Sequence, residues 1–280
     1  MIQNYKTKQR LINLVQYAIC VIFGSIIVVP VVLTALGGFK TLGQLNVDPV
    51  GWPNPFLWEN YIKIFTESRF FIYFYNSMFI MVFTVILDVL VAGFAGFALS
   101  RFKLKGKEII YNYILLGLLF PLTLAILPIY IQLRDLSLLD KYWGIILPQT
   151  AFLLPFHVMI FRGFIRQIPG ELEDACLIDG HGKLGFLFKI VFPLSRPAIA
   201  TVSVLAMVNS WNNYFLPLIV LNSRDKFTLP MGSMDFIGQY LADWNKILAF
   251  FTITMIPAIL FYIYSQKHII SGLTAGAVKG

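Results

Sequence analysis

Few residues of this sequence have the types and spacing that catalysis or metal binding needs. Gly180, Gly182 and Lys183 resemble the end of a phosphate-binding loop, G-x-x-x-x-G-K-[ST], but leucine stands at both of its remaining fixed positions, 177 and 184. The sequence has no H-E-x-x-H pair and no nucleophile elbow. The three histidines are widely separated: His157, His181 and His268. We therefore predict no catalysis, no bound metal and no cofactor within this chain.

Asp88 is the one acidic residue in the middle of a long apolar segment. An ionisable side chain at that depth in a membrane is a functional candidate by default, because charge is costly in hydrocarbon. Two interpretations are open. Asp88 either couples proton movement to transport, or it forms a hydrogen bond that packs its helix against a neighbour.

A group of amide and aromatic side chains between residues 209 and 214 interrupts a later apolar segment. Amides with aromatic rings suit a sugar, whose hydroxyl groups form hydrogen bonds and whose C–H faces stack on rings. Because polar groups at this depth face the bundle or a water-filled cavity, we predict a substrate path here. The alternatives are contacts between helices or an interfacial aromatic belt; Gln132 is a weaker candidate of the same kind. The group comprises Asn209, Trp211, Asn212, Asn213 and Tyr214.

The elements that must position these residues are membrane-spanning helices. Of the 280 residues, 58% are hydrophobic and only 13% are charged, whereas soluble domains contain about 25% charged residues. This composition excludes a soluble enzyme, a disordered chain and a disulfide scaffold. Cys20 lies in an apolar segment and Cys176 in a charged one, so we expect no disulfide bond.

Six segments have about the 20 apolar residues that one membrane crossing requires. We therefore predict an all-α polytopic membrane protein with a single transmembrane domain over residues 1–280. Residues 1–69 would hold the first span and an external loop, 70–265 the core, and 266–280 a tail. The predicted spans are Leu14–Leu36, Phe70–Leu99, Ile109–Leu133, Gly144–Ile165, Pro197–Leu221 and Ile247–Tyr264.

The loop charges predict the orientation. Both termini and the segments 100–108 and 162–196 carry 14 of the 22 Lys and Arg residues with only five acids, so their net charge is +9. The loops on the opposite side of the membrane carry eight basic and eight acidic residues. The positive-inside rule places both termini in the cytoplasm. The net charge of +8 is thereby explained by topology, and we expect a membrane rather than a nucleic acid as its partner.

The loop between the fourth and fifth spans has an unusual pattern for a connector. Pro169 can open a short helix with acids in its first turn, and Leu172, Ala175 and Cys176 would form a small apolar face. Gly180 is placed to end it with a left-handed cap, and a second helix would follow over Lys183–Val191. A helix lying on the membrane surface is the alternative, but such helices have a basic polar face and this one is acidic.

This loop resembles the E-A-A-x3-G-x9-I-x-L-P loop of ABC importer permeases. The corresponding residues are Asp174, Ala175, Cys176, Gly180, Ile190, Phe192 and Pro193. The sequence is similar to the permeases of binding-protein-dependent sugar importers, in particular the maltose-type second permease. Its tail from Gly272 to Gly280 resembles the tail of that subunit. Asp174 replaces the usual Glu, Cys176 the second Ala and Phe192 the Leu, but the acidic charge is retained.

The resemblance implies a cytoplasmic coupling helix that sits in a groove of a separate ATPase. Its contact residues would be Asp174, Ala175, Cys176, Asp179, Gly180, Ile190 and Pro193. The tail, with Gly276 and Lys279, would contact the ATPase dimer, although its composition alone fits a flexible linker.

The resemblance also implies the other components of an importer. They are a second homologous permease, two ATPase subunits that bind ATP and Mg²⁺, and an extracytoplasmic solute-binding protein. The chain would lie in the bacterial inner membrane and move a carbohydrate by alternating access. The alternative is an ion-coupled secondary transporter that uses Asp88.

Overall fold

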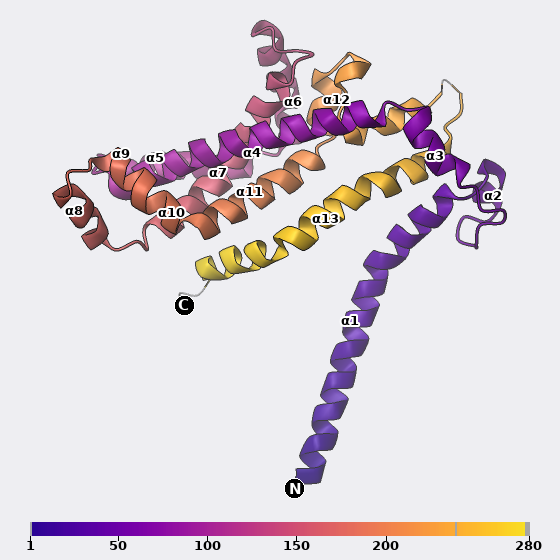
Figure 1. Ribbon diagram of the computed structural model, residues 1–280, viewed down its shortest axis with the longest axis horizontal. Helices are drawn as coiled ribbons and strands as arrows, with labels where there is room; N and C mark the ends of the chain where they lie inside the picture. The colour runs from indigo at the N-terminus through magenta and orange to yellow at the C-terminus, as the bar shows by residue number, and fades with distance from the viewer. Residues whose placement is uncertain (1, 239, 278–280) are drawn as a thin grey trace. The chain divides into compact units, whose positions relative to one another are not determined.

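The computed structural model describes residues 2–238 and 240–277, with side chains from residue 9 to residue 263 and at 266, apart from 11 and 239. Over this part the chain is helical and has no strand, only an isolated bridge between Ile237 and Ala242. This confirms the all-α class (Figure 1). The helices are α1 (Ile2–Gly38), α2 (Leu42–Val47), α3 (Glu59–Thr66), α4 (Phe70–Arg101), α5 (Lys107–Leu115), α6 (Leu122–Asp135), α7 (Trp143–Ile165), α8 (Gly170–Ile178), α9 (Lys183–Phe186), α10 (Phe192–Leu194), α11 (Arg196–Trp211), α12 (Phe215–Val220) and α13 (Trp244–Ala277).

The chain forms two compact units. The first contains the residues before Arg69 together with Ser233–Ile256, and the second contains Arg69–Gly232 and the residues from Pro257 onward. Helix α13 passes from the first unit to the second at its internal Pro257. In the first unit, Lys40 is fully buried and donates to the carbonyls of Asp48, at 2.8 Å, and Pro49, at 3.0 Å. These bonds fix the turn after α1.

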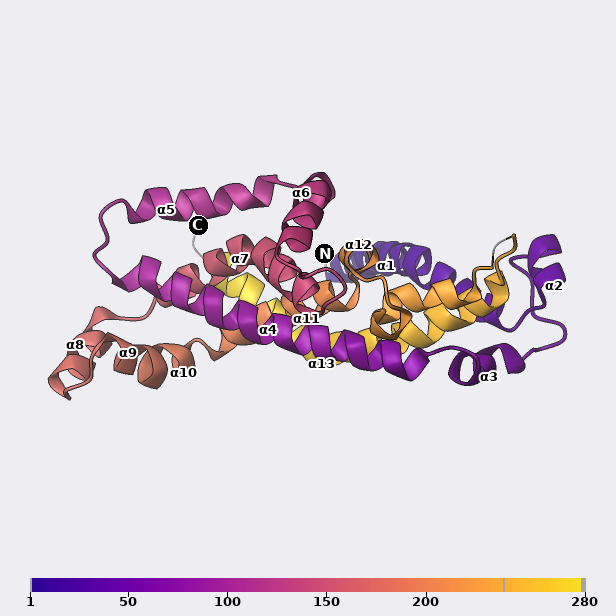
Figure 2. The same cartoon turned by 90° about the horizontal axis from the view of Figure 1, so that it is seen from above.

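In the second unit α4, α7 and α11 lie side by side (Figures 1 and 2). Gly96 permits the close approach of α4 and α7, because a Cβ atom there would lie 2.7 Å from Cβ of Phe161 and 3.1 Å from the amide nitrogen of Arg162. The buried core of this region is apolar and includes Ala92, Phe97, Phe161, Ile165, Phe186, Val191 and Val202.

Four predicted spans are continuous helices in the structure, within α1, α4, α7 and α13. The other two predicted spans are interrupted within their length: the third, Ile109–Leu133, is bent, and the fifth, Pro197–Leu221, is broken. The third bends by 103° between Lys107–Leu119 and Leu122–Asp135, since Pro121 lacks an N–H and pushes Phe120 into an extended conformation. The described part of the chain therefore has four continuous candidate spans, or up to six if each bent pair is one span.

The fifth predicted span, Pro197–Leu221, is divided between α11 and α12 at the polar residues 212–214. The segment before it, Lys183–Leu194, is bent by 75° from α11. The predicted helix over Lys183–Val191 is α9 followed by a π-helical stretch, Leu187–Val191. A widened turn is the physical response to Pro193, whose ring would clash with the carbonyl of Lys189 in a regular α-helix.

Helix α13 continues to Ala277 and takes in the first part of the predicted tail. Gly276 lies in its last turn, so this part of the tail is helical and not a flexible linker. Lys279 lies outside the described residues.

Candidate functional site

Helix α8 and the turn after it form the segment that the sequence analysis singles out. Gly180 has φ of +81°, the left-handed conformation that a glycine cap requires. The N–H of Gly180 donates to the Leu177 carbonyl and that of His181 to the Cys176 carbonyl, both at 3.0 Å. These two bonds are a Schellman motif, which confirms the predicted short helix and its glycine cap.

The side chains of α8 divide between two faces. Cys176 is buried against the core that contains Phe186, whereas Leu172 and Ala175 are exposed. The predicted apolar face is therefore reduced to Cys176. The physical reason is that α8 packs on this core at the edge of the unit, so only a narrow stripe of a nine-residue helix is covered.

The outer face of α8 is acidic at its edges and apolar near its end. Among the predicted contact residues, Asp174, Ala175, Asp179, Gly180 and Pro193 are exposed, Ile190 is half-buried, and Cys176 faces inward. Ile178 is 86% exposed. Ile178 thus lies next to the carboxylate of Asp179 and one helical turn after Asp174 on the outer face.

The polar run of the predicted substrate path lies at the break between α11 and α12. Trp211 is buried, with its ring 5.8 Å from that of Phe74 and 5.5 Å from that of Phe261, so packing occupies it. Asn213 Oδ1 accepts the N–H of Leu216 at 3.3 Å and caps α12.

The remaining candidates of the path differ in exposure. Asn209 and Asn212 are exposed and Tyr214 is half-buried. Gln132 is exposed on α6, which packs against α12. Non-helical backbone at membrane depth occurs only inside protein or beside a water-filled cavity, so the break is a natural place for such a path.

Asp88 of α4 contacts His157 of α7. Asp88 Oδ2 lies 2.5 Å from His157 Nδ1, and both side chains are almost fully buried, at 0% and 1% exposure. This is the contact that the packing interpretation of Asp88 predicts.

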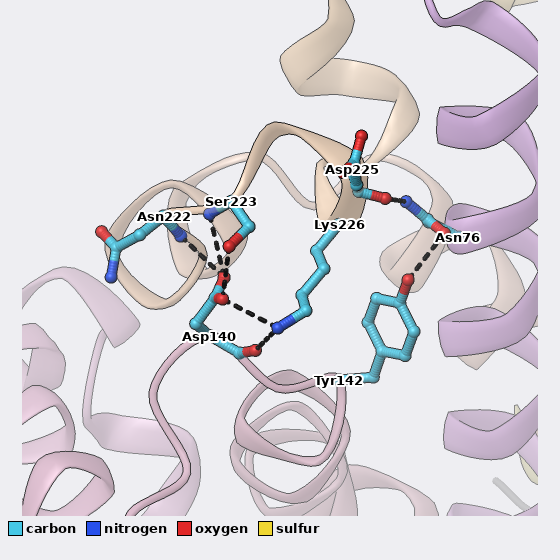
Figure 3. Close-up of polar contacts among 7 residues, drawn as sticks. All are labelled: Asn76, Asp140, Tyr142, Asn222, Ser223, Asp225 and Lys226. Atoms are coloured by element: carbon cyan, nitrogen blue, oxygen red, sulfur yellow. Dashed lines mark hydrogen bonds and ion pairs between the residues drawn. The ribbon is translucent and has the colours of Figure 1, made fainter.

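Sequence reasoning did not find a polar network at the other end of the second unit. Asp140, in the loop between α6 and α7, accepts the N–H groups of Asn222 and Ser223 at 3.0 Å and the Ser223 hydroxyl at 2.6 Å (Figure 3). Lys226 Nζ donates to its carboxylate at 2.8 Å and to its carbonyl at 2.6 Å. No sequence pattern could reveal this network, because its two segments are separated by several helices.

The contacts of Asp140 change its acidity. Partial burial by itself raises the pKa of Asp140, but the Lys226 ammonium, the Ser223 hydroxyl and the two backbone N–H groups outweigh it. The net result is a pKa well below the usual range. Asp140 therefore stays ionised and holds the two loops together.

Asn76 extends this network to α4. Its amide donates to the carbonyl of Asp225 at 2.8 Å and its oxygen accepts the Tyr142 hydroxyl at 2.7 Å (Figure 3). The same amide also donates to the carbonyl of Phe227 at 2.9 Å. Burial raises the pKa of Tyr142, so this hydroxyl keeps its proton and remains a donor. The starts of α4 and α7 are thus joined to the segment after α12.

The described side chains include no group of three or more His, Cys, Asp or Glu residues placed to hold a metal ion. Both cysteines are free: Cys20 is exposed and Cys176 is buried.

A comparison with protein families matches residues 68–274 to the family described as "Binding-protein-dependent transport system inner membrane component". The match covers well over half of the chain. The chain belongs to this family.

Several named permease proteins are similar to this chain over nearly their whole length. The arabinooligosaccharides transport system permease protein AraQ of Halalkalibacterium halodurans is 34% identical over 91% of this chain and 92% of its own. The diacetylchitobiose uptake system permease protein NgcG of Streptomyces coelicolor is 30% identical, over 95% of this chain and 88% of its own. The multiple sugar-binding transport system permease protein MsmG of Streptococcus mutans is 30% identical, over 94% and 96%.

Solved structures agree on the fold of this family. A chain from a bacterial ABC transporter involved in the import of the acidic polysaccharide alginate superposes with a TM-score of 0.81 at 22% identity, covering 93% of this chain and 97% of that one. The family match begins at residue 68 and the second unit at Arg69. Helix α8, the Asp88–His157 pair and the Asp140 network therefore all lie within the inner membrane component region.

Proposed function

We propose that this chain is one permease subunit of an ATP-driven ABC importer for a carbohydrate. A separate ATPase supplies the energy and an extracytoplasmic binding protein delivers the solute. A second homologous permease completes the translocation path, and two ATPase subunits bind ATP and Mg²⁺.

The observation that carries this proposal is the exposed outer face of α8. A nine-residue helix with Asp174, Asp179 and Ile178 outward, ended by a rigid glycine turn, fits a mechanical contact with a partner. A permease component with no nucleotide-binding motif of its own needs such a contact to receive energy. Asp174 would pair with a basic residue of the ATPase groove, and Gly180 would leave room for its wall.

The carbohydrate assignment rests on the named relatives and on the polar break at residues 212–214. Amide groups of Asn209 and Asn212, with Tyr214 nearby, supply hydrogen-bond donors, acceptors and one ring for stacking. In alternating access, closure of the ATPase dimer would move α8, and the helices packed on it would reorient a cavity shared with the second permease. The positive-inside charge pattern supports cytoplasmic termini and a cytoplasmic α8.

The energy source tests the proposal directly. The chain is co-expressed with its candidate partner permease and ATPase, reconstituted in proteoliposomes, and supplied with its binding protein and a labelled oligosaccharide. We expect uptake that requires ATP and is unchanged by a protonophore.

Uptake that continues without ATP and stops when the proton gradient is collapsed would contradict the proposal. It would favour the ion-coupled carrier that uses Asp88. Asp88 forms a buried pair with His157, and Asp88→Asn, which keeps a hydrogen-bond acceptor but removes the ionisable group, separates the two roles.

A further inference from the structure

Arg101, the last residue of α4, reaches the end of α7. Its Nη2 donates to the carbonyl of Ile165, the last residue of α7, at 2.8 Å, and also to the carbonyl of Ile168. The last carbonyls of a helix lack partners within the helix and carry the negative end of its dipole. The Arg101 guanidinium donates hydrogen bonds to these carbonyls and places a positive charge at the negative end of the α7 dipole. Arg101 therefore joins the ends of α4 and α7.

The same guanidinium faces α8. Its Nη1 lies 3.7 Å from Oε2 of Glu173, and the two side chains are only 12% and 13% exposed. The guanidinium also lies over the ring of Phe186 in α9, 5.8 Å from its centroid. Electrostatic attraction is screened little at such burial. Arg101 of α4 thus contacts three successive helices, α7, α8 and α9, at this end of the unit.

Glu173 and its neighbour Asp174 point in different directions. Asp174 is exposed on the outer face of α8, whereas Glu173 faces the body of the protein. Glu173 also pairs with Lys183 at the start of α9, but that lysine is 43% exposed. Besides the packing of Cys176 in the apolar core that also holds Phe97 of α4, the polar link from α8 to α4 is the little-exposed Arg101 contact, and the polar link to α9 is the more exposed Lys183 contact.

Covalent connections alone would transmit a push on α8 poorly to α4. The chain path from α8 to α4 in sequence runs back through α7, α6 and α5. Arg101 bypasses that path, because its guanidinium lies within ion-pair distance of Glu173 and it stands on a 32-residue helix that packs along both α7 and α11.

We infer that Arg101 and Glu173 are positioning residues that transmit the displacement of α8 to α4. This inference rests on the proposed function of α8 as the ATPase contact. The pair acts after docking, since neither side chain belongs to the exposed outer face. Its loss should separate ATP hydrolysis from transport while leaving the ATPase bound.

The test compares Glu173→Gln, Arg101→Gln and the double variant in the full reconstituted transporter. Three quantities are measured: ATPase subunits retained on purification, ATP hydrolysis, and solute uptake. We expect retained ATPase, hydrolysis within about twofold of wild type, and about tenfold less uptake per ATP, in the range of mutations along a coupled network. The double variant should be no worse than Arg101→Gln alone, because Glu173 acts through its contact with Arg101.

Lys183→Gln is the matched control. It removes the exposed partner of the same Glu173 carboxylate, and its uptake per ATP should stay within about twofold of wild type. Arg101→Lys keeps the positive charge but cannot bridge the carbonyls and Glu173 as a planar fork does. We expect this variant to fold and to show an intermediate loss of uptake per ATP.

Several results would overturn the inference. They are wild-type uptake per ATP in both single variants, additive losses in the double variant, and loss of bound ATPase, which would make the pair a docking element. Aggregation of both Glu173→Gln and Arg101→Lys would make it a folding element and would also contradict the inference. Failure of the proposed function itself is distinguishable, because the wild-type complex would then show no ATP-dependent uptake.

Discussion

Asp140 makes a contribution to stability that can be measured by removing one charge. Asp140→Asn loses the attraction to Lys226 and weakens the bonds from Asn222 and Ser223. Hydrogen bonds to charged groups contribute about 1.5–3 kcal/mol each, and we expect a loss of about that size for the variant. Thermal unfolding of the purified chain in detergent at pH 7 measures it.

The effect of Asp140→Asn should depend on pH. The folded-state pKa of Asp140 is lowered, whereas the unfolded chain titrates near about 3.9. The stabilisation is therefore complete above that pH and is lost as pH falls through the folded-state pKa. Asp135→Asn is the control: its pair with Arg134 is 60% exposed on both sides, so the change should be below about 1 kcal/mol. Equal stability of wild type and Asp140→Asn at pH 7 would contradict this account.

Substitutions of Asp88 distinguish a packing role of this side chain from a role in proton coupling. Asp88→Asn keeps an oxygen that can accept a hydrogen bond from His157, so ATP-driven uptake should stay within about threefold of wild type. Asp88→Leu leaves His157 buried without its partner and should lower the free energy of unfolding by about 1–3 kcal/mol. Uptake and thermal unfolding are measured on both variants. A folded Asp88→Asn protein without uptake would favour the ion-coupled alternative.

At the scale of elements, a bulky side chain in the turn after α8, at Gly180 or Gly182, should lower ATP-dependent uptake if a partner docks there. No atom of the described chain lies within 4 Å of a Cβ built at Gly180 or at Gly182. Gly180→Ala therefore adds only the strain of a positive φ, about 1–2 kcal/mol. Gly180→Trp adds the same strain and a bulky side chain whose Cβ starts in open space, so a partner docked on this turn would meet it. We expect it to lower ATP-dependent uptake about tenfold more than Gly180→Ala does.

Gly182→Trp is the matched variant, because Gly182 has a negative φ of −75° and the same open surroundings. Its backbone is unstrained, so a loss of uptake in this variant does not arise from the strain of a positive φ. Equal uptake losses in Gly180→Ala and Gly180→Trp would assign the effect to backbone strain and contradict docking at this turn.

The sequence predicts some elements closely and others poorly, for identifiable reasons. Helices α4 and α7 begin and end within two residues of the predicted spans, because membrane depth imposes the length of an uninterrupted apolar run. The bend at Pro121 and the break at 212–214 could not be placed, since a proline in a membrane helix is compatible with either a kink or a full break. The Gly180 cap was predictable because it depends on local chemistry.

Contacts between distant residues lay beyond sequence reasoning. Two ion pairs join segments that only the packing of α4, α7 and their neighbours brings together. They are Asp140 with Lys226, and Arg101 with Glu173. Cys176 illustrates the same limit: the motif resemblance predicts a contact with a partner, and its side chain lies in the core of this chain.

At the scale of the whole molecule, the charge pattern predicts that both termini lie in the cytoplasm. A fluorescent protein fused after Gly280 should fluoresce, and alkaline phosphatase fused at the same position should be inactive, because that enzyme needs the external side. The reference fusion ends after Asp48, in the segment predicted to be external, and there phosphatase should be active. Active phosphatase at Gly280 would contradict the assigned orientation.

The central claim, that α8 contacts a nucleotide-hydrolysing partner, is tested most directly by site-specific crosslinking. The background replaces the native thiols with Cys20→Ser and Cys176→Ala. Ile178→Cys then places a single thiol on α8, and Val47→Cys places a comparable one on α2; the native side chains are 86% and 88% exposed. In membranes that contain the whole transporter, we predict that a thiol-to-amine crosslinker joins Ile178→Cys, and not Val47→Cys, to the ATPase subunit. An ATPase that copurifies with the chain but is never joined to Ile178→Cys would contradict the claim.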